Sequence, residues 1–108
     1  MQAYTSTLPC RIQRKRIAGW VQPDNTRYVG RPSIFANPFD WREVGRERAV
    51  KLFRQWLNGD LDDRYPDFVS RRRQLVKRLK ELRGKNLSCW CPEDEPCHVD
   101  VLIEAANK

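Results

Sequence analysis

The sequence predicts a small α/β domain in which a single sheet is flanked by about three helices. Two long segments carry apolar side chains at helical spacing, which is typical of helices that pack on a core. Shorter apolar segments end at Gly or Pro, as strands do, and the last of them leads through a turn into a final helix. With 108 residues, 40% of them apolar, the chain has room for one core. We therefore expect one domain over residues 11–108, after a flexible lead-in over residues 1–10.

The first two strands are expected close together in the sequence. Ile12 lies among basic residues, which indicates an edge strand with a basic face over residues 11–16. After a run of turn residues, a second strand is predicted over residues 26–29, ending at Gly30. Together the two segments predict a β-hairpin or strand pair. The loop over residues 30–41 carries bulky apolar side chains, so we expect it to lie ordered against the core.

Two helices and a strand-turn-helix unit are expected in the rest of the chain. Apolar spacing predicts one helix over residues 44–57 and a second over residues 66–82. The inner stripe expected for the second helix is Val69, Leu75, Val76, Leu79 and Leu82. Its many arginines are expected to form a solvated face. A short apolar strand over residues 85–91, a turn, and a helix that opens at Cys97 complete the domain.

Charge and composition narrow the classes of partner. The formal charge of +7 favours an anionic partner, although a solvated basic surface explains it equally well. No run of about 18 apolar residues is present, and the first residues lack the features of a signal peptide, so we expect a cytoplasmic protein without a membrane partner. In that compartment the four cysteines should stay reduced. No cofactor is expected, and a homo-oligomer remains open.

Cysteine and histidine side chains gather at the predicted junction of the last strand and the last helix. Cys89, Cys91, Cys97 and His98 match a tetrahedral zinc site in number and type. Adjacent side chains at a helix start diverge by about 100°, however, which makes it hard for Cys97 and His98 to reach one ion. We favour burial for Cys89 and Cys91. For Cys97 and His98 we favour a role facing a ligand, because a helix start attracts anions and lowers a thiol pKa.

A second group of polar residues lies in the loop that follows the second strand. Arg31 offers a planar fork for phosphate or carboxylate, and Ser33 and Asn37 add neutral hydrogen-bonding groups. From the basic first strand, Arg14 and Arg16 can wall the same pocket. The aromatic rings expected to stack on a base are those of Phe35, Phe39 and Trp41.

Several segments are similar to those of a known family, namely Arg11-Ile-Gln-Arg-Lys-Arg-Ile-Ala-Gly-Trp20, Tyr28-Val-Gly-Arg-Pro-Ser33, Asn37-Pro-Phe39, Leu82-Arg-Gly-Lys-Asn-Leu87, Cys89-Trp-Cys-Pro92 and Cys97-His-Val-Asp-Val-Leu102. The family that they resemble is the domain of unknown function DUF4326. The resemblance covers nearly the whole chain from Arg11. One departure is Phe35-Ala36, where the family usually has a Trp-Gly pair before Asn-Pro-Phe. The Cys-His segment is also similar to DUF488, a family not generally regarded as zinc-dependent, and this resemblance argues against zinc.

DUF4326 is frequent in phages of actinobacteria and in bacteria. By association, related small phage and nucleotide-linked domains imply a nucleotide-derived ligand. The leading hypothesis is a binding module for a small phosphorylated molecule of ADP-ribose or cyclic-nucleotide type, as in a phage protein that sequesters a host immune signal. One alternative is an enzyme acting on the same ligand class, with Cys97 or His98 as the catalytic group and Asp100 as an orienting partner. A further alternative is a nucleic-acid-binding domain.

Overall fold

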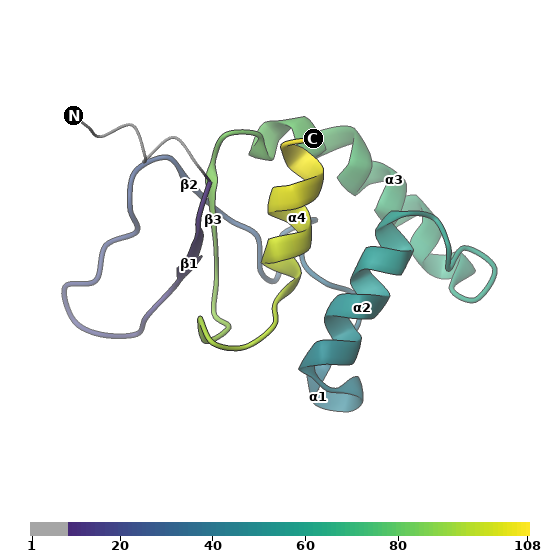
Figure 1. Cartoon of the computed structure of the whole chain (residues 1–108), viewed down its shortest axis with the longest axis horizontal. Coiled ribbons are helices and arrows are strands. Elements are labelled where there is room, and N and C mark those ends of the chain that lie inside the picture. Colours follow the sequence, from purple (N-terminus) through teal and green to yellow (C-terminus); the bar gives the residue numbers. More distant parts are fainter. Residues whose placement is uncertain (1–8) are drawn as a thin grey trace.

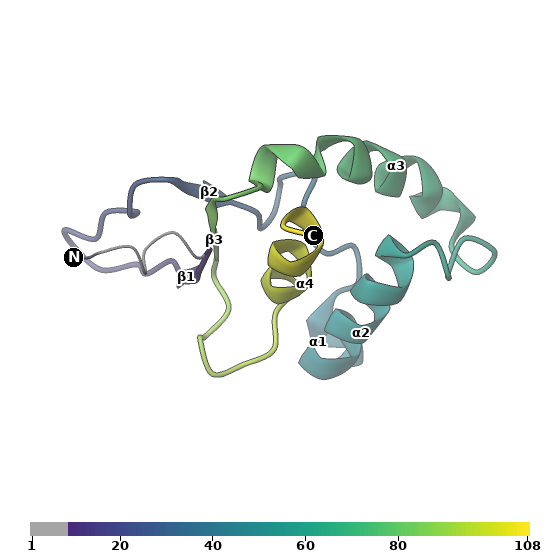
Figure 2. The same ribbon diagram turned by 45° about the horizontal axis from the view of Figure 1, so that its top comes forward.

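A parallel sheet of short strands stands at one side of the molecule, a computed structural model that describes residues 9–108 (Figure 1). In this part of the chain β1 (Arg11–Gln13) and β2 (Thr26–Tyr28) both pair in parallel with β3 (Asn86–Cys89), in the order β1-β3-β2. The helices cover one face of the sheet in both views (Figure 2). The predicted α/β class, one sheet flanked by helices, is confirmed. Residues 1–8 of the predicted lead-in lie outside the described residues.

The predicted hairpin over residues 11–29 is wrong. β1 and β2 run in the same direction and each pairs with β3, which lies between them. Parallel strands need a connection of about a dozen residues, and residues 14–25 supply it without a helix. The apolar β3 segment fits the central position, because a strand covered on both faces has little polar surface to expose.

Alternation along β3 directs its side chains to the two faces of the sheet. Leu87 and Cys89 are buried in the core under the helices, with 0% and 2% of their surfaces exposed. Ser88 is equally buried, but it belongs to the other face, where its hydroxyl lies 2.7 Å from Gln22 Oε1. The long connection between β1 and β2 therefore covers the face of the sheet opposite the helices (Figure 1).

The predicted helix over residues 44–57 is two helices, α1 (Trp41–Val44) and α2 (Arg46–Leu57). Asp40 begins α1, since its Oδ1 accepts the backbone N–H of Arg42 at 2.9 Å. Gly45 separates the helices with φ 89° and ψ 153°, a conformation open almost only to glycine. The chain therefore turns at Gly45 before α2 starts, which the apolar spacing did not reveal.

The predicted helix over residues 66–82 consists of three parts. The 3-10 turns η2 (Pro66–Phe68) and η3 (Leu79–Leu82) flank α3 (Val69–Arg78). Within the predicted inner stripe, Leu75 is fully buried but Val76 is 45% exposed, so its placement in the stripe is wrong. Val76 lies about 100° around the helix from Leu75, beyond the narrow strip that faces the core.

The arginines of α3 are only in part a solvated face. Arg71 donates to the backbone oxygen of Ala36 at 3.0 Å, and Arg72 forms an ion pair with Asp62 at 2.7 Å. These two side chains fasten α3 to neighbouring loops. Arg73 is exposed, as predicted for the whole group.

α4 (His98–Ala106) lies between the sheet and α2, and its N-cap is Cys97 (Figure 1). Its buried face is formed by Val99, Val101, Leu102 and Ala106. This face joins the aromatic side chains of α2 in the core. As a result, the first turn of α4 is fixed beside the carboxyl end of β3. Among residues 9–108, no helix combines the length and apolar character needed to cross a membrane.

Candidate functional site

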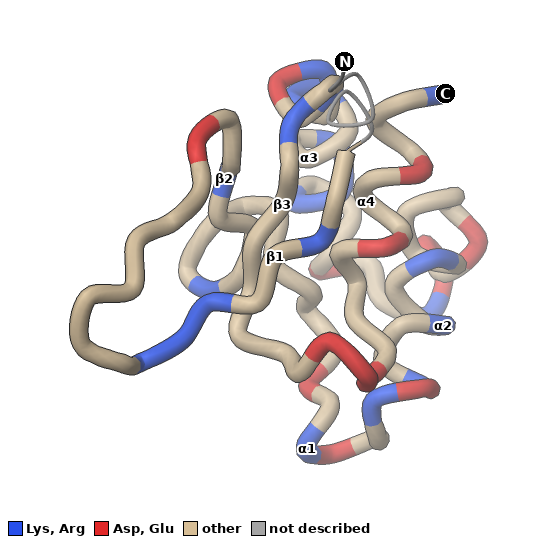
Figure 3. Tube along the Cα trace, turned by 60° about the vertical axis from the view of Figure 1, so that its left-hand side comes forward, with Lys and Arg blue, Asp and Glu red and all other residues tan. Residues whose placement is uncertain are grey.

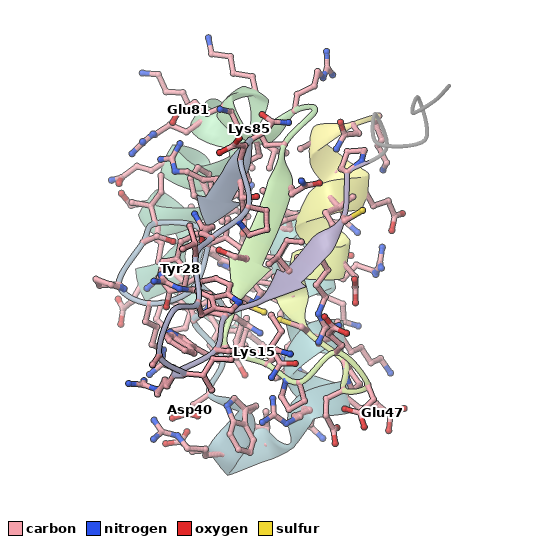
Figure 4. The ribbon with its side chains drawn as sticks, turned by 90° about the vertical axis from the view of Figure 1, so that its left-hand side faces the viewer. Lys15, Tyr28, Asp40, Glu47, Glu81 and Lys85 are labelled. Carbon is pink, nitrogen blue, oxygen red and sulfur yellow. The ribbon has the colours of Figure 1, made fainter. Side chains whose placement is uncertain are left out.

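A cavity of about 620 Å³ opens at the carboxyl ends of the strands, beside the first turn of α4. Its lining comes from the loop after β2, from α1 and the start of α2, and from the segment that joins β3 to α4. Open α/β sheets bind ligands at this edge, and the volume is typical of small-molecule sites. In Figure 4, Lys15, Asp40 and Glu47 lie toward this end of the molecule, and Glu81 and Lys85 lie at the other.

Arginines dominate the polar part of the lining, which includes Arg16, Arg31, Arg42 and Arg46. Arg42 is ion-paired with Asp40 at 3.1 Å, and this hydrogen-bonded contact lowers the pKa of the Asp40 carboxyl. Arg16 and Arg46 instead lie over aromatic rings. Figure 3 shows the basic segment after β1 and the acidic turn after β3 at the same end of the molecule as α1.

Aromatic rings accompany these guanidinium groups. The guanidinium carbon of Arg46 is 3.8 Å from the ring centre of Trp41, and that of Arg16 is 4.3 Å from the ring centre of Trp90. Trp41 and Trp90 are 45% and 39% exposed, so a flat ligand can reach both rings. Phe35 was expected to stack on a ligand, but it is 1% exposed and belongs to the core.

Three cysteines meet at the inner end of the cavity, and we call Cys89, Cys91 and Cys97 the thiol cluster. Their sulfur atoms all lie within 4.8 Å of one another, and Cys89 Sγ is 3.3 Å from Cys97 Sγ. Alternation explains why Cys89 and Cys91 point the same way, two residues apart at the end of β3. Cys97 reaches them from the N-cap of α4.

Hydrogen bonds within the thiol cluster shift the pKa values of its cysteines in opposite directions. Hydrogen bonds with Cys89 and then Cys97 lower the pKa of Cys91. The pKa of Cys97 is raised, first by its hydrogen bond with Cys89. This is the reverse of the lowering expected for a thiol at a helix start, because here two neighbouring sulfurs outweigh the helix N–H groups.

His98 is held in one tautomer. Its Nε2 lies 3.0 Å from the backbone oxygen of Val29, and since a carbonyl only accepts, Nε2 carries the proton. Burial lowers the pKa of His98, so the ring is neutral and its Nδ1 has a lone pair. That lone pair faces Cys97 Sγ at 3.5 Å. Asp100, expected to orient this pair, forms an ion pair with Arg11 instead.

The structure brings together some of the sequence-predicted residues and not others. Arg16, Arg31, Asn37, Cys97 and His98 line the cavity, whereas Arg14 and Ser33 are outside the lining that the described residues form. The Asn37 amide is engaged locally, since Nδ2 donates to Ala49 O and Oδ1 accepts the N–H of Phe39. The Ser33 hydroxyl accepts the N–H of Phe35. Arg14 lies over the rings of Tyr28 and Trp90, at 4.8 and 5.1 Å.

The lining residues that the sequence analysis did not assign to the site include Tyr28, Arg42, Arg46 and Trp90. The predicted hairpin left the start of the first long helix far from the last strand, so Arg42 and Arg46 had no place at the site. A parallel pairing would have put both at the same sheet edge. The Asp40 cap ahead of Trp41 was the one local signal of a helix beginning there.

The fold and the cavity define a small parallel-sheet α/β domain with an arginine-rich cavity over clustered thiols. The model of DUF4326, a domain of unknown function, matches residues 12–108, and the chain belongs to this family. No curated protein and no solved structure matches the chain significantly.

Proposed function

We propose that the cavity binds a small anionic molecule that carries an aromatic ring, of the nucleotide-derived type. The observation that carries this proposal is the pairing of guanidinium groups with exposed indole rings inside one cavity, at Arg46 with Trp41 and at Arg16 with Trp90. An indole ring can stack on a base, and a guanidinium group beside it can donate to a phosphate.

The first turn of α4 supports the same ligand class. The helix starts at His98, at the inner end of the cavity, where its first N–H groups and its dipole favour an anion. Arg31 is exposed at the rim, and its guanidinium adds a further bidentate donor for phosphate. The cavity volume of about 620 Å³ suits a molecule of the size of ADP-ribose or a cyclic dinucleotide. Binding without turnover would sequester such a molecule, which fits a phage protein directed at a host immune signal.

Calorimetry on the full chain against ADP-ribose derivatives and cyclic dinucleotides tests the proposal. Arg46→Ala should weaken the binding of the ligand that is found by at least tenfold, because it removes a charged hydrogen bond worth about 1.5–3 kcal/mol. Arg73→Ala is the matched control, since Arg73 is an exposed arginine of α3 outside the cavity lining. Folded protein that binds nothing on this panel, or equal losses in the two variants, would exclude the proposal.

An enzyme is the second candidate, because Cys91 is half-buried and lines the cavity, which puts its sulfur within reach of a bound ligand. Its hydrogen bonds with Cys89 and Cys97 lower its pKa, which favours the nucleophilic thiolate form. Cys97 fits this role less well than Cys91, because its hydrogen bonds with Cys89 and Cys91, and then its burial, raise its pKa. Incubating the bound ligand with the protein and analysing it by mass spectrometry separates the two functions. Recovery of unchanged ligand identifies a binding module, and a cleaved or transferred product identifies an enzyme.

A further inference from the structure

The thiol cluster has the residue types and the spacing of a metal site. Metal binding there would be a function separate from ligand binding in the cavity. We propose that Cys89, Cys91 and Cys97 bind one Zn²⁺ through their thiolates, with Nδ1 of His98 as the fourth ligand. This site goes beyond the proposed ligand binding and does not depend on it.

The sulfur positions fit one ion. With Zn–S bonds of about 2.3 Å, tetrahedral geometry places neighbouring sulfurs about 3.8 Å apart. The three Sγ atoms of the cluster all lie within 4.8 Å of one another, and the shortest pair is 3.3 Å apart. Shifts of a few tenths of an ångström to about one ångström therefore bring all three sulfurs to bonding distance of a common centre.

The histidine is prepared to be a ligand. Zn–N and Zn–S bonds of the usual lengths place nitrogen about 3.5 Å from a neighbouring sulfur. His98 Nδ1 lies 3.5 Å from Cys97 Sγ, although it is outside the group whose atoms are all within 4.8 Å. Its other nitrogen donates to the Val29 carbonyl, and metal-binding histidines are commonly held by such a bond. His98 therefore offers its Nδ1 lone pair on the side of Cys97, where an ion held by the thiol cluster would lie.

Arg11 contacts the turn that joins β3 to α4 and so places Cys97 near the end of β3. One guanidinium nitrogen donates to the backbone oxygens of both Pro92 and Glu95, at 2.5 and 2.7 Å. Another pairs with Asp100 at 3.1 Å, in the first turn of α4. The turn between Cys91 and Cys97 is therefore fixed from β1, and it holds Cys97 beside the end of β3.

A disulfide is the competing explanation for the short contact between Cys89 and Cys97. It would bring their sulfurs from 3.3 Å to about 2.05 Å and would leave Cys91 and the Nδ1 lone pair of His98 without a role. The approach of a third sulfur to the same point favours the metal, and His98 Nδ1 lies 3.5 Å from one of the three sulfurs. The disulfide is therefore an outcome that the experiment must detect.

The experiment measures zinc in the full chain, purified under reducing conditions, loaded with Zn²⁺ and freed of excess by gel filtration. Wild-type protein should retain about one equivalent, and Co²⁺ in place of Zn²⁺ should give the intense visible spectrum of a tetrahedral thiolate site. Cys91→Ser should lower the Zn²⁺ affinity at least 100-fold in competition with a chelator. Cys91 is the half-buried member of the cluster, so this variant disturbs the core least.

Cys10→Ser is the matched control, because Cys10 is exposed and outside the cluster. It should keep the wild-type zinc content and affinity. His98→Gln should alter the cobalt spectrum and weaken Zn²⁺ binding, and an unchanged spectrum would remove His98 as the fourth ligand. Less than about a tenth of an equivalent in folded, reduced wild-type protein would overturn the site. So would equal zinc loss in the two cysteine variants, or a Cys89–Cys97 disulfide that persists under reduction. None of these outcomes affects the calorimetric test of ligand binding.

Discussion

Replacing Arg11 with Met tests whether this one side chain organises the site. Arg11 is 12% exposed at its side chain and connects β1 to the turn after β3 and to α4. Its ion pair with Asp100, which is 57% exposed, is worth at most about 1 kcal/mol. The part-buried hydrogen bond to Pro92 O adds about 1.5 kcal/mol. The exposed bond to Glu95 O adds little, because water replaces it.

One feature offsets part of this loss. Within residues 9–108, Nε of Arg11 is buried without a hydrogen-bond partner, and methionine removes that unsatisfied group while it keeps much of the apolar stem. We therefore expect Arg11→Met to lower the free energy of unfolding by about 2 kcal/mol. For a domain of this size that corresponds to a fall in Tm of roughly 8 °C.

Thermal unfolding followed by circular dichroism provides the assay. Arg54→Met is the control, because Arg54 forms a comparable ion pair with Glu104 at 3.0 Å while both side chains are about half exposed. It should change stability by less than about 1 kcal/mol. Equal and small effects in the two variants would refute the conclusion that Arg11 fixes the turn that carries Cys97.

Three further changes test the fold. Gly45→Ala should destabilise the protein by about 1–3 kcal/mol in denaturant unfolding, since φ is 89° at this position although a Cβ would meet open space there; an unchanged midpoint would argue for one continuous helix. Leu75→Ala should cost about 2–5 kcal/mol because Leu75 is fully buried, whereas Val76→Ala should be nearly neutral; the opposite ranking would restore the predicted stripe. Asp40→Ala should destabilise at neutral pH. Arg42 lowers the pKa of the Asp40 carboxyl, so its stabilisation is present above the unfolded pKa and is lost as pH falls through the lower folded pKa. The Tm difference between wild type and variant should therefore shrink in strong acid, and a difference that grows there would contradict the cap.

Local sequence signals predicted most of the helical segments and the last strand. The apolar spacing around Phe53 and Trp56 reports directly on burial, and both are buried in α2. The helix start at Cys97 was also placed correctly. The position of a helix and its first residue depend on residues that are near one another in the sequence, so the local pattern of amino acids predicts them.

The features that failed depend on partners far away in the sequence. Nothing within residues 11–29 indicates that β3, some 60 residues later, separates the two strands. Phe35 was expected to stack on a ligand because polar residues such as Arg31 share its loop, but it is 1% exposed, and the guanidinium groups of Arg27 in β2 and Arg78 in α3 lie over its ring. The cysteines were recognised as a group, yet their mutual approach depends on the turn that Arg11 holds, and no spacing rule contains that contact.

The parallel arrangement of the strands places the arginine-rich cavity next to the thiol cluster. An experiment can tell whether the arginines or a bound Zn²⁺ attract an anionic ligand. A Zn²⁺ held by three thiolates and a neutral imidazole carries a net charge of −1, so the ion would not supply the attraction for an anionic ligand. The arginines would supply it. Arg46→Ala should therefore weaken ligand binding at least tenfold, for the loss of one charged hydrogen bond, and leave the zinc content of the protein unchanged. Parallel calorimetry and metal analysis of this variant decide the point. Loss of zinc together with ligand would show instead that the ligand and the metal share one site.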